Sequence, residues 1–154
     1  QPAYTHVAWE DHRRLLAILD GQPREQQDRP LVYGYFTDPQ VGRLGLTLEQ
    51  AQERGLRVRE ARLDLTQVGR ARLEGRTRGV YKILVEEDTD RIVGATLVGP
   101  AAAELVHIIL AHVMTGATWQ VLADSVYVYP SYAEDLPTLA RELRQTPREA
   151  AQSA

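Results

Sequence analysis

The sequence predicts an α+β fold, an antiparallel sheet with helices packed on one face. Segments rich in β-branched and aromatic residues follow one another through the middle of the chain, helical segments lie before and after them, and two strands are joined by a tight turn. The chain has 154 residues, of which 44% are hydrophobic and 25% charged. This is the size and composition of one globular domain.

The first predicted element is a helix over residues 5–19. Thr5 is a preferred N-cap residue, an apolar stripe follows it, and Gly21 provides a C-terminal stop. Residues 22–30 are polar, rich in proline and glutamine and without a hydrophobic face, which is typical of a linker. A single helix cannot bury its apolar stripe alone, so this arrangement is unusual for a complete domain.

Strands are predicted over residues 31–36, 58–68, 79–86 and 91–98. Residues 58–68 alternate polar and apolar side chains, which fits one half-buried strand or two short ones. The last two segments form a hairpin around the turn at residues 87–90. Gly94 and Gly99 flank the returning strand, where glycine indicates a β-bulge or a close approach of another part of the chain.

Further helices are predicted over residues 47–54, 101–115, 118–123 and 131–144. Thr47 with Gln50, and Ser131 with Glu134, each have the spacing of a capping box. The second of these helices is apolar almost all round, and such a helix is buried on most faces. With the apolar and aromatic segment at residues 126–129, it presents more apolar surface than one core can cover, so we expect a two-fold homodimer.

Charge, cysteine content and histidine spacing exclude several classes of function. With 18 basic and 21 acidic residues and a net charge of −3, the chain has no electrostatic basis for binding nucleic acid or an anionic membrane. The absence of cysteine excludes disulfides, thiolate metal sites and a cysteine nucleophile. The pairs His6/His12 and His107/His112 do not have the i, i+4 spacing of a helical zinc pair, so we expect no metal site.

Other sequence features narrow the context. No apolar run reaches the roughly 18–20 residues of a membrane span, and no glycine-rich phosphate loop is present. We expect a cytoplasmic protein. Because the sequence begins at Gln1 without a leader, we also expect a fragment or a processed form.

Four stretches carry a further signal. They are FTDPQV and LGLT within residues 36–47, the hairpin from Gly79 to Ala95, AELV at residues 103–106, and Tyr129-Pro130-Ser131 with Glu134. Their order and spacing over residues 31–144 resemble the dimerisation domain of the pyridine nucleotide-disulfide oxidoreductases, the family of glutathione reductase, dihydrolipoamide dehydrogenase and mercuric reductase. In that family the first stretch reads F-T-x-P-E-x-x-x-V-G-L-T and the last reads His-Pro-Thr-x-x-Glu.

The resemblance implies the C-terminal interface domain of an FAD-dependent, NAD(P)H-linked oxidoreductase that forms a homodimer and lends residues to the partner subunit's active site. The first 21 residues resemble the terminal helix of the family's FAD-binding domain, whose N-terminus points at the flavin, so Thr5 and His6 are the expected cofactor-binding residues. The rest of the FAD site would lie upstream, so we expect this piece to be colourless and inactive alone. The expected organisation is residues 1–21 for that helix, 22–30 for the linker, 31–146 for the dimerisation domain and 147–154 for a flexible tail.

One position departs from the family pattern. Tyr129 stands where the family has the histidine that acts as acid and base toward the thiolates, and Glu134 stands where a glutamate orients that histidine, so the resemblance makes both expected catalytic residues. A phenol titrates near ~10 and an imidazole near ~6.5, so at neutral pH Tyr129 can donate a hydrogen bond but is a poor base. Glu134 also has a purely structural role available in the capping box with Ser131.

This substitution favours an electron acceptor that needs no thiol base, either a metal ion, as in mercuric reductase-like enzymes, or a quinone. The alternative from another class is a free-standing α+β regulatory or ligand-binding module, because the residues alone show no self-contained catalytic set.

Overall fold

The computed structural model describes residues 4–22 and 30–145. The chain divides into two compact units, Gln1–Pro30 and Leu31–Ala154. Most of the predicted linker and the whole predicted tail at residues 147–154 lie outside the described residues.

The first unit contains the helix α1 (Thr5–Leu19), over the predicted residues. Tyr4, with an extended backbone, occupies the N-cap position, and Thr5 is the first helical residue. The predicted N-cap role of Thr5 is therefore wrong, because the helix begins one residue earlier than its first capping-type side chain indicates. At the other end Gly21 adopts φ +69° directly after the C-cap Asp20, in the conformation that ends helices most readily.

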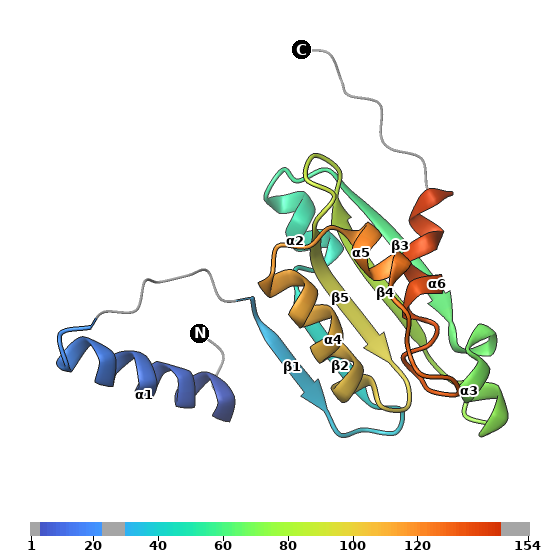
Figure 1. Ribbon diagram of the computed structural model, residues 1–154, viewed down its shortest axis with the longest axis horizontal. Coiled ribbons are helices and arrows are strands. Elements are labelled where there is room, and N and C mark those ends of the chain that lie inside the picture. The colour runs from blue at the N-terminus through green and yellow to red at the C-terminus, as the bar shows by residue number, and fades with distance from the viewer. Residues whose placement is uncertain (1–3, 23–29, 146–154) are drawn as a thin grey trace, which may run out of the picture. The chain divides into compact units, whose positions relative to one another are not determined.

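The second unit is built on a five-stranded sheet in which all neighbouring strands are antiparallel, as predicted (Figure 1). In spatial order the strands are β1 (Val32–Tyr35), β2 (Val41–Gly45), β5 (Ile92–Val98), β4 (Val80–Glu86) and β3 (Val58–Asp64). β2 is absent from the sequence prediction, because its residues VGRLG lack the alternation that indicates a strand. Residues 58–68 form β3 and then the short 3₁₀ helix η1 (Leu65–Gln67).

The helices of this unit are α2 (Leu48–Glu53), α3 (Gly69–Leu73), α4 (Ala102–Met114), α5 (Trp119–Asp124), α6 (Leu136–Arg141) and the 3₁₀ helix η2 (Glu142–Arg144). α4 packs on β2 and β5 and α6 packs on β3 and β4, so these helices cover one face of the sheet (Figure 1). The capping box predicted for α2 is complete: the N–H of Gln50 donates to Thr47 Oγ1 (3.1 Å) and the N–H of Thr47 donates to Gln50 Oε1 (3.0 Å). The five-residue α3 is too short to show a period in the sequence.

The sequence predicts burial on most faces of residues 101–115, partly in a homodimer, and in a single chain α4 is buried on the face that packs on the sheet. Its buried residues are Ala102, Leu105, Val106 and Ile109. Met114, at its end, is 58% exposed. The helix lies on the surface of the sheet, so its outer side stays open in a single chain.

The last helix begins later than predicted. α6 starts at Leu136, with Asp135 in the N-cap position and Pro137 in the first turn, so Ser131 is not its cap. Proline favours the first turn of a helix, which places the start after the turn at residues 131–135. Half of the predicted capping box is present all the same, because the N–H of Ser131 donates to Glu134 Oε2 (2.9 Å).

The core lies between the sheet and these helices. Four cross-strand neighbours, each at most 2% exposed, form a row across it: Leu44, Ala95, Ile83 and Ala61. α4 approaches β2 most closely at Gly42, where a Cβ atom would lie 2.2 Å from the carbonyl oxygen of Ala102. The close approach predicted at Gly94 is confirmed, since a Cβ atom there would lie 2.1 Å from the carbonyl oxygen of Leu46.

Tyr81, in β4, is the largest fully buried side chain of this core. Its hydroxyl has no hydrogen-bond partner among the described residues. Burial, with smaller contributions from Tyr132 and Asp135, raises the pKa of Tyr81 well above the ordinary value for tyrosine. Above about pH 10 the unfolded chain loses this proton while the folded chain keeps it, so stability falls as the pH rises further.

We expect Tyr81→Phe to be at least as stable as wild type at neutral pH, because it removes a buried hydroxyl that has no described protein partner. Above about pH 10 its advantage should grow by up to ~1.4 kcal/mol per pH unit. Urea unfolding at neutral pH and above about pH 10 measures the difference in the free energy of unfolding between the variant and wild type. Tyr35→Phe, at an exposed ring, is the matched control for loss of a hydroxyl. A Tyr81→Phe protein that is clearly less stable than wild type at neutral pH would contradict this reading of the core.

Candidate functional site

An exposed apolar strip, residues 126–129, follows directly after α5. The side chains of Val126, Val128 and Tyr129 are 94%, 77% and 79% exposed, whereas Tyr127 packs against the core. Large apolar side chains gathered in one exposed segment are typical of an interaction surface. This 126–129 strip ends at one of the two predicted catalytic residues.

The structure places those two residues at opposite ends of one turn. Tyr129 precedes the turn, and its ring is open to solvent. Glu134 accepts the N–H of Ser131, and Asp135 accepts the N–H of Gly69 at the start of α3 (2.9 Å). Within the described residues, the carboxylate of Glu134 therefore holds the backbone of the turn, and no hydrogen bond joins it to the phenol of Tyr129.

The predicted cofactor-binding residues, Thr5 and His6, lie in the first turn of α1. There the Tyr4 ring stacks on the His6 ring, with centroids 5.6 Å apart and planes at 10°. Thr5 and His6 also line an open hollow together with Trp9 and His12. The partial positive charge of a helix N-terminus suits the electron-rich edge of a flavin, so this turn fits one part of a flavin site. A complete dinucleotide site also needs a glycine-rich βαβ unit, which the 154-residue sequence does not contain.

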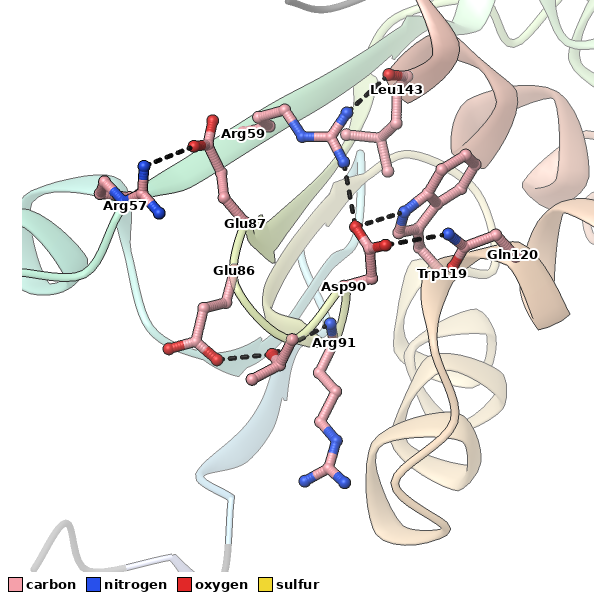
Figure 2. Close-up of polar contacts among 10 residues, drawn as sticks. Arg57, Arg59, Glu86, Glu87, Asp90, Arg91, Trp119, Gln120 and Leu143 are labelled. Atoms are coloured by element: carbon pink, nitrogen blue, oxygen red, sulfur yellow. Dashed lines mark hydrogen bonds and ion pairs between the residues drawn. The ribbon is translucent and has the colours of Figure 1, made fainter. Parts of the chain in front are cut away.

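A polar cluster that the sequence did not predict lies beside α5 (Figure 2). Asp90, in the turn between β4 and β5, accepts hydrogen bonds on Oδ1 from Arg59 Nη2 (3.2 Å) and Trp119 Nε1 (3.1 Å). Its Oδ2 accepts one from Gln120 Nε2 (3.1 Å). Arg59 and Trp119 are 6% and 7% exposed, and the guanidinium carbon of Arg59 lies 5.9 Å from the centroid of the Trp119 ring. These four residues form the Asp90 cluster.

The sequence carries little signal for the Asp90 cluster. Aspartate is an ordinary residue in a hairpin turn, and its presence there needs no buried partner. What brings Arg59 and Trp119 to Asp90 is the order of the strands, which places β3 beside β4 and α5 against the end of the hairpin.

Arg43 is a second buried cation, on the sheet face opposite α4. Its Nη1 donates to the carbonyl oxygens of Leu44 (2.9 Å) and Ala95 (2.7 Å), and burial lowers its pKa. Nearby, Lys82 pairs with Glu60 at 2.8 Å. Both cations are thus engaged within the chain, so this face is not preformed for an anion.

Among residues 4–22 and 30–145, no three histidine, aspartate or glutamate side chains gather closely enough to hold a metal ion. No described helix combines the length and the apolar character that crossing a bilayer requires.

A family model matches most of the second unit. The model of the pyridine nucleotide-disulphide oxidoreductase dimerisation domain matches residues 32–140. The chain belongs to this family. The matched range runs from β1 into α6 and contains the Asp90 cluster, Tyr129 and Glu134, whereas α1 lies outside it. The family and the α+β fold predicted from the sequence are both confirmed.

Curated members of this oxidoreductase family align with most of the chain. It is 30% identical to RclA of Escherichia coli strain K12, a probable pyridine nucleotide-disulfide oxidoreductase, over 88% of this chain and 31% of RclA. It is 36% identical to mercuric reductase of Staphylococcus aureus, over 90% of this chain and 26% of that enzyme. For dihydrolipoyl dehydrogenase 3 of Haloarcula marismortui the identity is 28%, over 94% and 30% of the two chains. The chain therefore spans less than a third of the length of these relatives.

Solved structures of family members share its fold. The HOCl-induced flavoprotein disulfide reductase RclA from Escherichia coli matches with a TM-score of 0.83 and 30% identity, over 90% of this chain and 32% of RclA. LpdA from Mycobacterium tuberculosis matches with a TM-score of 0.83 and 25% identity, over 92% of this chain and 31% of LpdA.

Proposed function

We propose that this chain is the homodimerisation domain of an FAD-dependent NAD(P)H oxidoreductase. In this proposal residues 31–146 form the dimerisation domain, and residues 1–21, joined to it by the linker at 22–30, are the terminal helix of the FAD-binding domain. Family membership supports the first assignment. Relatives named as a flavoprotein disulfide reductase, a mercuric reductase and a dihydrolipoyl dehydrogenase support the reaction class.

The open apolar surface of the second unit is the observation that carries this proposal. It comprises the 126–129 strip and Met114, which is 58% exposed at the end of α4. A two-fold interface that covered both would remove this apolar area from water in each subunit at once. Tyr129 stands at the end of the strip, so its phenol would reach the partner's active site, while Glu134 would hold the turn behind it.

The chain's own part in the chemistry is limited to positioning and to hydrogen bonding. FAD, when bound to the parent protein, supplies hydride and electron transfer. The first turn of α1, with Thr5 and His6, would lie at the pyrimidine edge of the flavin, where a helix N-terminus stabilises negative charge. With a quinone as the acceptor, the phenol of Tyr129 would donate a hydrogen bond to a carbonyl oxygen of the quinone bound in the partner subunit.

In the same proposal the acceptor is a metal ion or a quinone, and the parent is mercuric reductase-like or a related acceptor reductase. A neutral phenol can donate a hydrogen bond but cannot take a proton from a thiol at neutral pH. The carboxylate of Glu134 already accepts the N–H of Ser131. The 36% identity to a mercuric reductase favours the metal ion.

We expect this chain to sediment as a dimer at micromolar concentration, because burying the 126–129 strip is favourable. The double substitution Val126→Asp with Val128→Asp should convert it to a monomer, since it would bury two unpaired charges in each copy of the strip. Sedimentation equilibrium measures both. Leu73→Asp, at a 69% exposed leucine on α3, is the matched control and should leave the dimer intact. A wild-type chain that is monomeric under these conditions, or a Leu73→Asp chain that dissociates equally, would sink this assignment of the interface.

A further inference from the structure

We propose that the Asp90 cluster is a positioning device for Tyr129. It fixes the start of α5, and through α5 it sets the place and angle at which the 126–129 strip presents Tyr129 to the partner subunit. This inference rests on the proposed function, because it is that function which gives Tyr129 a task in the partner's active site.

Asp90 holds the first two residues of α5 against the sheet. Besides the bonds from its side chain to Trp119 and Gln120, its carbonyl oxygen accepts the N–H of Trp119 (2.9 Å). Beside it, Arg91 and Thr118 form an antiparallel β-bridge. The turn of the β4–β5 hairpin therefore fixes the N-terminal end of this helix through both backbone and side-chain hydrogen bonds.

Arg59 links the start of α5 to two further elements of the chain. From β3, its Nη2 pairs with Asp90, and its Nη1 donates to the carbonyl oxygen of Leu143 in η2 (2.9 Å). Arg59 is 6% exposed and Asp90 23% exposed, so salt screens this pair less than a surface pair, and loss of the Asp90 carboxylate would remove the ion pair of a buried guanidinium. Both carboxylate oxygens of Asp90 are engaged within the chain, so the cluster orders neighbouring elements and is not a site for a ligand.

α5 connects the Asp90 cluster to the 126–129 strip. The helix is six residues long, about 9 Å, and the Ser125 hydroxyl donates to the carbonyl oxygen of Val121 (2.7 Å) where the helix ends. The 126–129 strip follows at once, and the turn beyond it is fixed by Glu134 and Asp135. Tyr129 is thus held between two anchored points, and a rotation of α5 at its start would displace the phenol.

The hairpin turn by itself does not need the carboxylate. Asp90 adopts φ +55°, a conformation in which glycine carries the least steric cost. Buried ion pairs often add little net stability compared with apolar residues of similar volume, whereas their directional bonds favour one arrangement over others. Control of geometry accounts for an aspartate at this position better than stability does.

The test is a double-mutant cycle in the full-length parent enzyme, with 1,4-benzoquinone as the acceptor. Asp90→Asn should lower kcat about 10-fold, because a displacement of the order of 1 Å can cost up to ~100-fold. Tyr129→Phe should lower it about 100-fold, as the loss of one aligned hydrogen-bond donor does elsewhere. The double variant should match Tyr129→Phe within about 2-fold, since no phenol remains to be positioned. KM for NAD(P)H and the rate of flavin reduction should stay at their wild-type values in every variant.

Asp88→Asn is the matched control: it lies on the same turn, is paired with Arg57 at the surface and should leave kcat unchanged. If Asp90→Asn does not fold, Trp119→Phe replaces it in the same cycle, because that change removes one bond to Asp90 and keeps an aromatic ring. An Asp90→Asn enzyme with wild-type kcat, or effects of Asp90→Asn and Tyr129→Phe that simply multiply, would overturn the positioning role and leave the proposed function standing. Wild-type turnover of 1,4-benzoquinone by Tyr129→Phe would overturn both the positioning role and the part proposed for Tyr129 in the partner's active site.

Discussion

Gly42→Ala is expected to destabilise the folded chain by about 3 kcal/mol, at the upper end of what overpacking a core costs. The new methyl group would lie 2.2 Å from the carbonyl oxygen of Ala102 and 3.1 Å from Cβ of Val106. The first obstacle is backbone at the start of α4, which cannot move aside by changing a rotamer. α4 would have to lift from β2 and expose Leu44 and its neighbours in the core.

Gly34→Ala provides the matched comparison, on the neighbouring strand and under the same helix. Its Cβ would lie 3.1 Å from the carbonyl oxygen of Val41 and 3.2 Å from Cβ of Ala103, contacts that shifts of a few tenths of an ångström relieve. Neither glycine has a positive φ, so the comparison isolates packing from backbone strain. Thermal unfolding by circular dichroism should give a clearly lower Tm for Gly42→Ala than for Gly34→Ala. Equal Tm values would show that α4 does not sit on β2 as described.

The fold was largely predictable because most of its elements carry local signals. The hairpin of β4 and β5 is rich in β-branched residues on both sides of a turn, and α2 has a complete capping box at Thr47 and Gln50. β2 carries no such signal, since its contribution is two glycines that admit neighbouring backbone at Ala102 and Val93. The role of these two glycines can be recognised only in the folded chain, where the neighbouring backbone packs against them.

The start of the last helix shows the limit of a local motif. Ser131 and Glu134 have capping-box spacing, yet only the bond from the Ser131 N–H to Glu134 forms, and the helix begins after Asp135. Asp135, at the N-cap position, accepts the N–H of Gly69, which lies more than sixty residues away along the chain and belongs to no local motif. No local sequence motif predicts the Asp90 cluster either, because its members come from three separate parts of the sequence.

Under the proposed function, the full-length parent enzyme is expected to reduce Hg²⁺ or 1,4-benzoquinone at least about 100-fold faster than oxidised glutathione or lipoamide. General acid–base catalysis contributes about 10²–10⁴-fold, and disulfide reduction in this family relies on a base where this chain has Tyr129. A phenol is a poor base at neutral pH, so the reduction of a disulfide loses that contribution. Steady-state assays with NAD(P)H and each acceptor measure the ratio directly.

Tyr129→His supplies the reverse test, because an imidazole with a pKa near ~6.5 can serve as the missing base. The substitution should raise disulfide turnover by about 10-fold or more and leave metal-ion or quinone turnover equal or lower. The control is Tyr127→His, two residues earlier, whose ring packs toward the core and so cannot reach a partner subunit. Efficient disulfide turnover by the wild-type enzyme that collapses in Tyr129→Phe would mean that the tyrosine does the work of the histidine, and the proposed acceptor class would then be wrong.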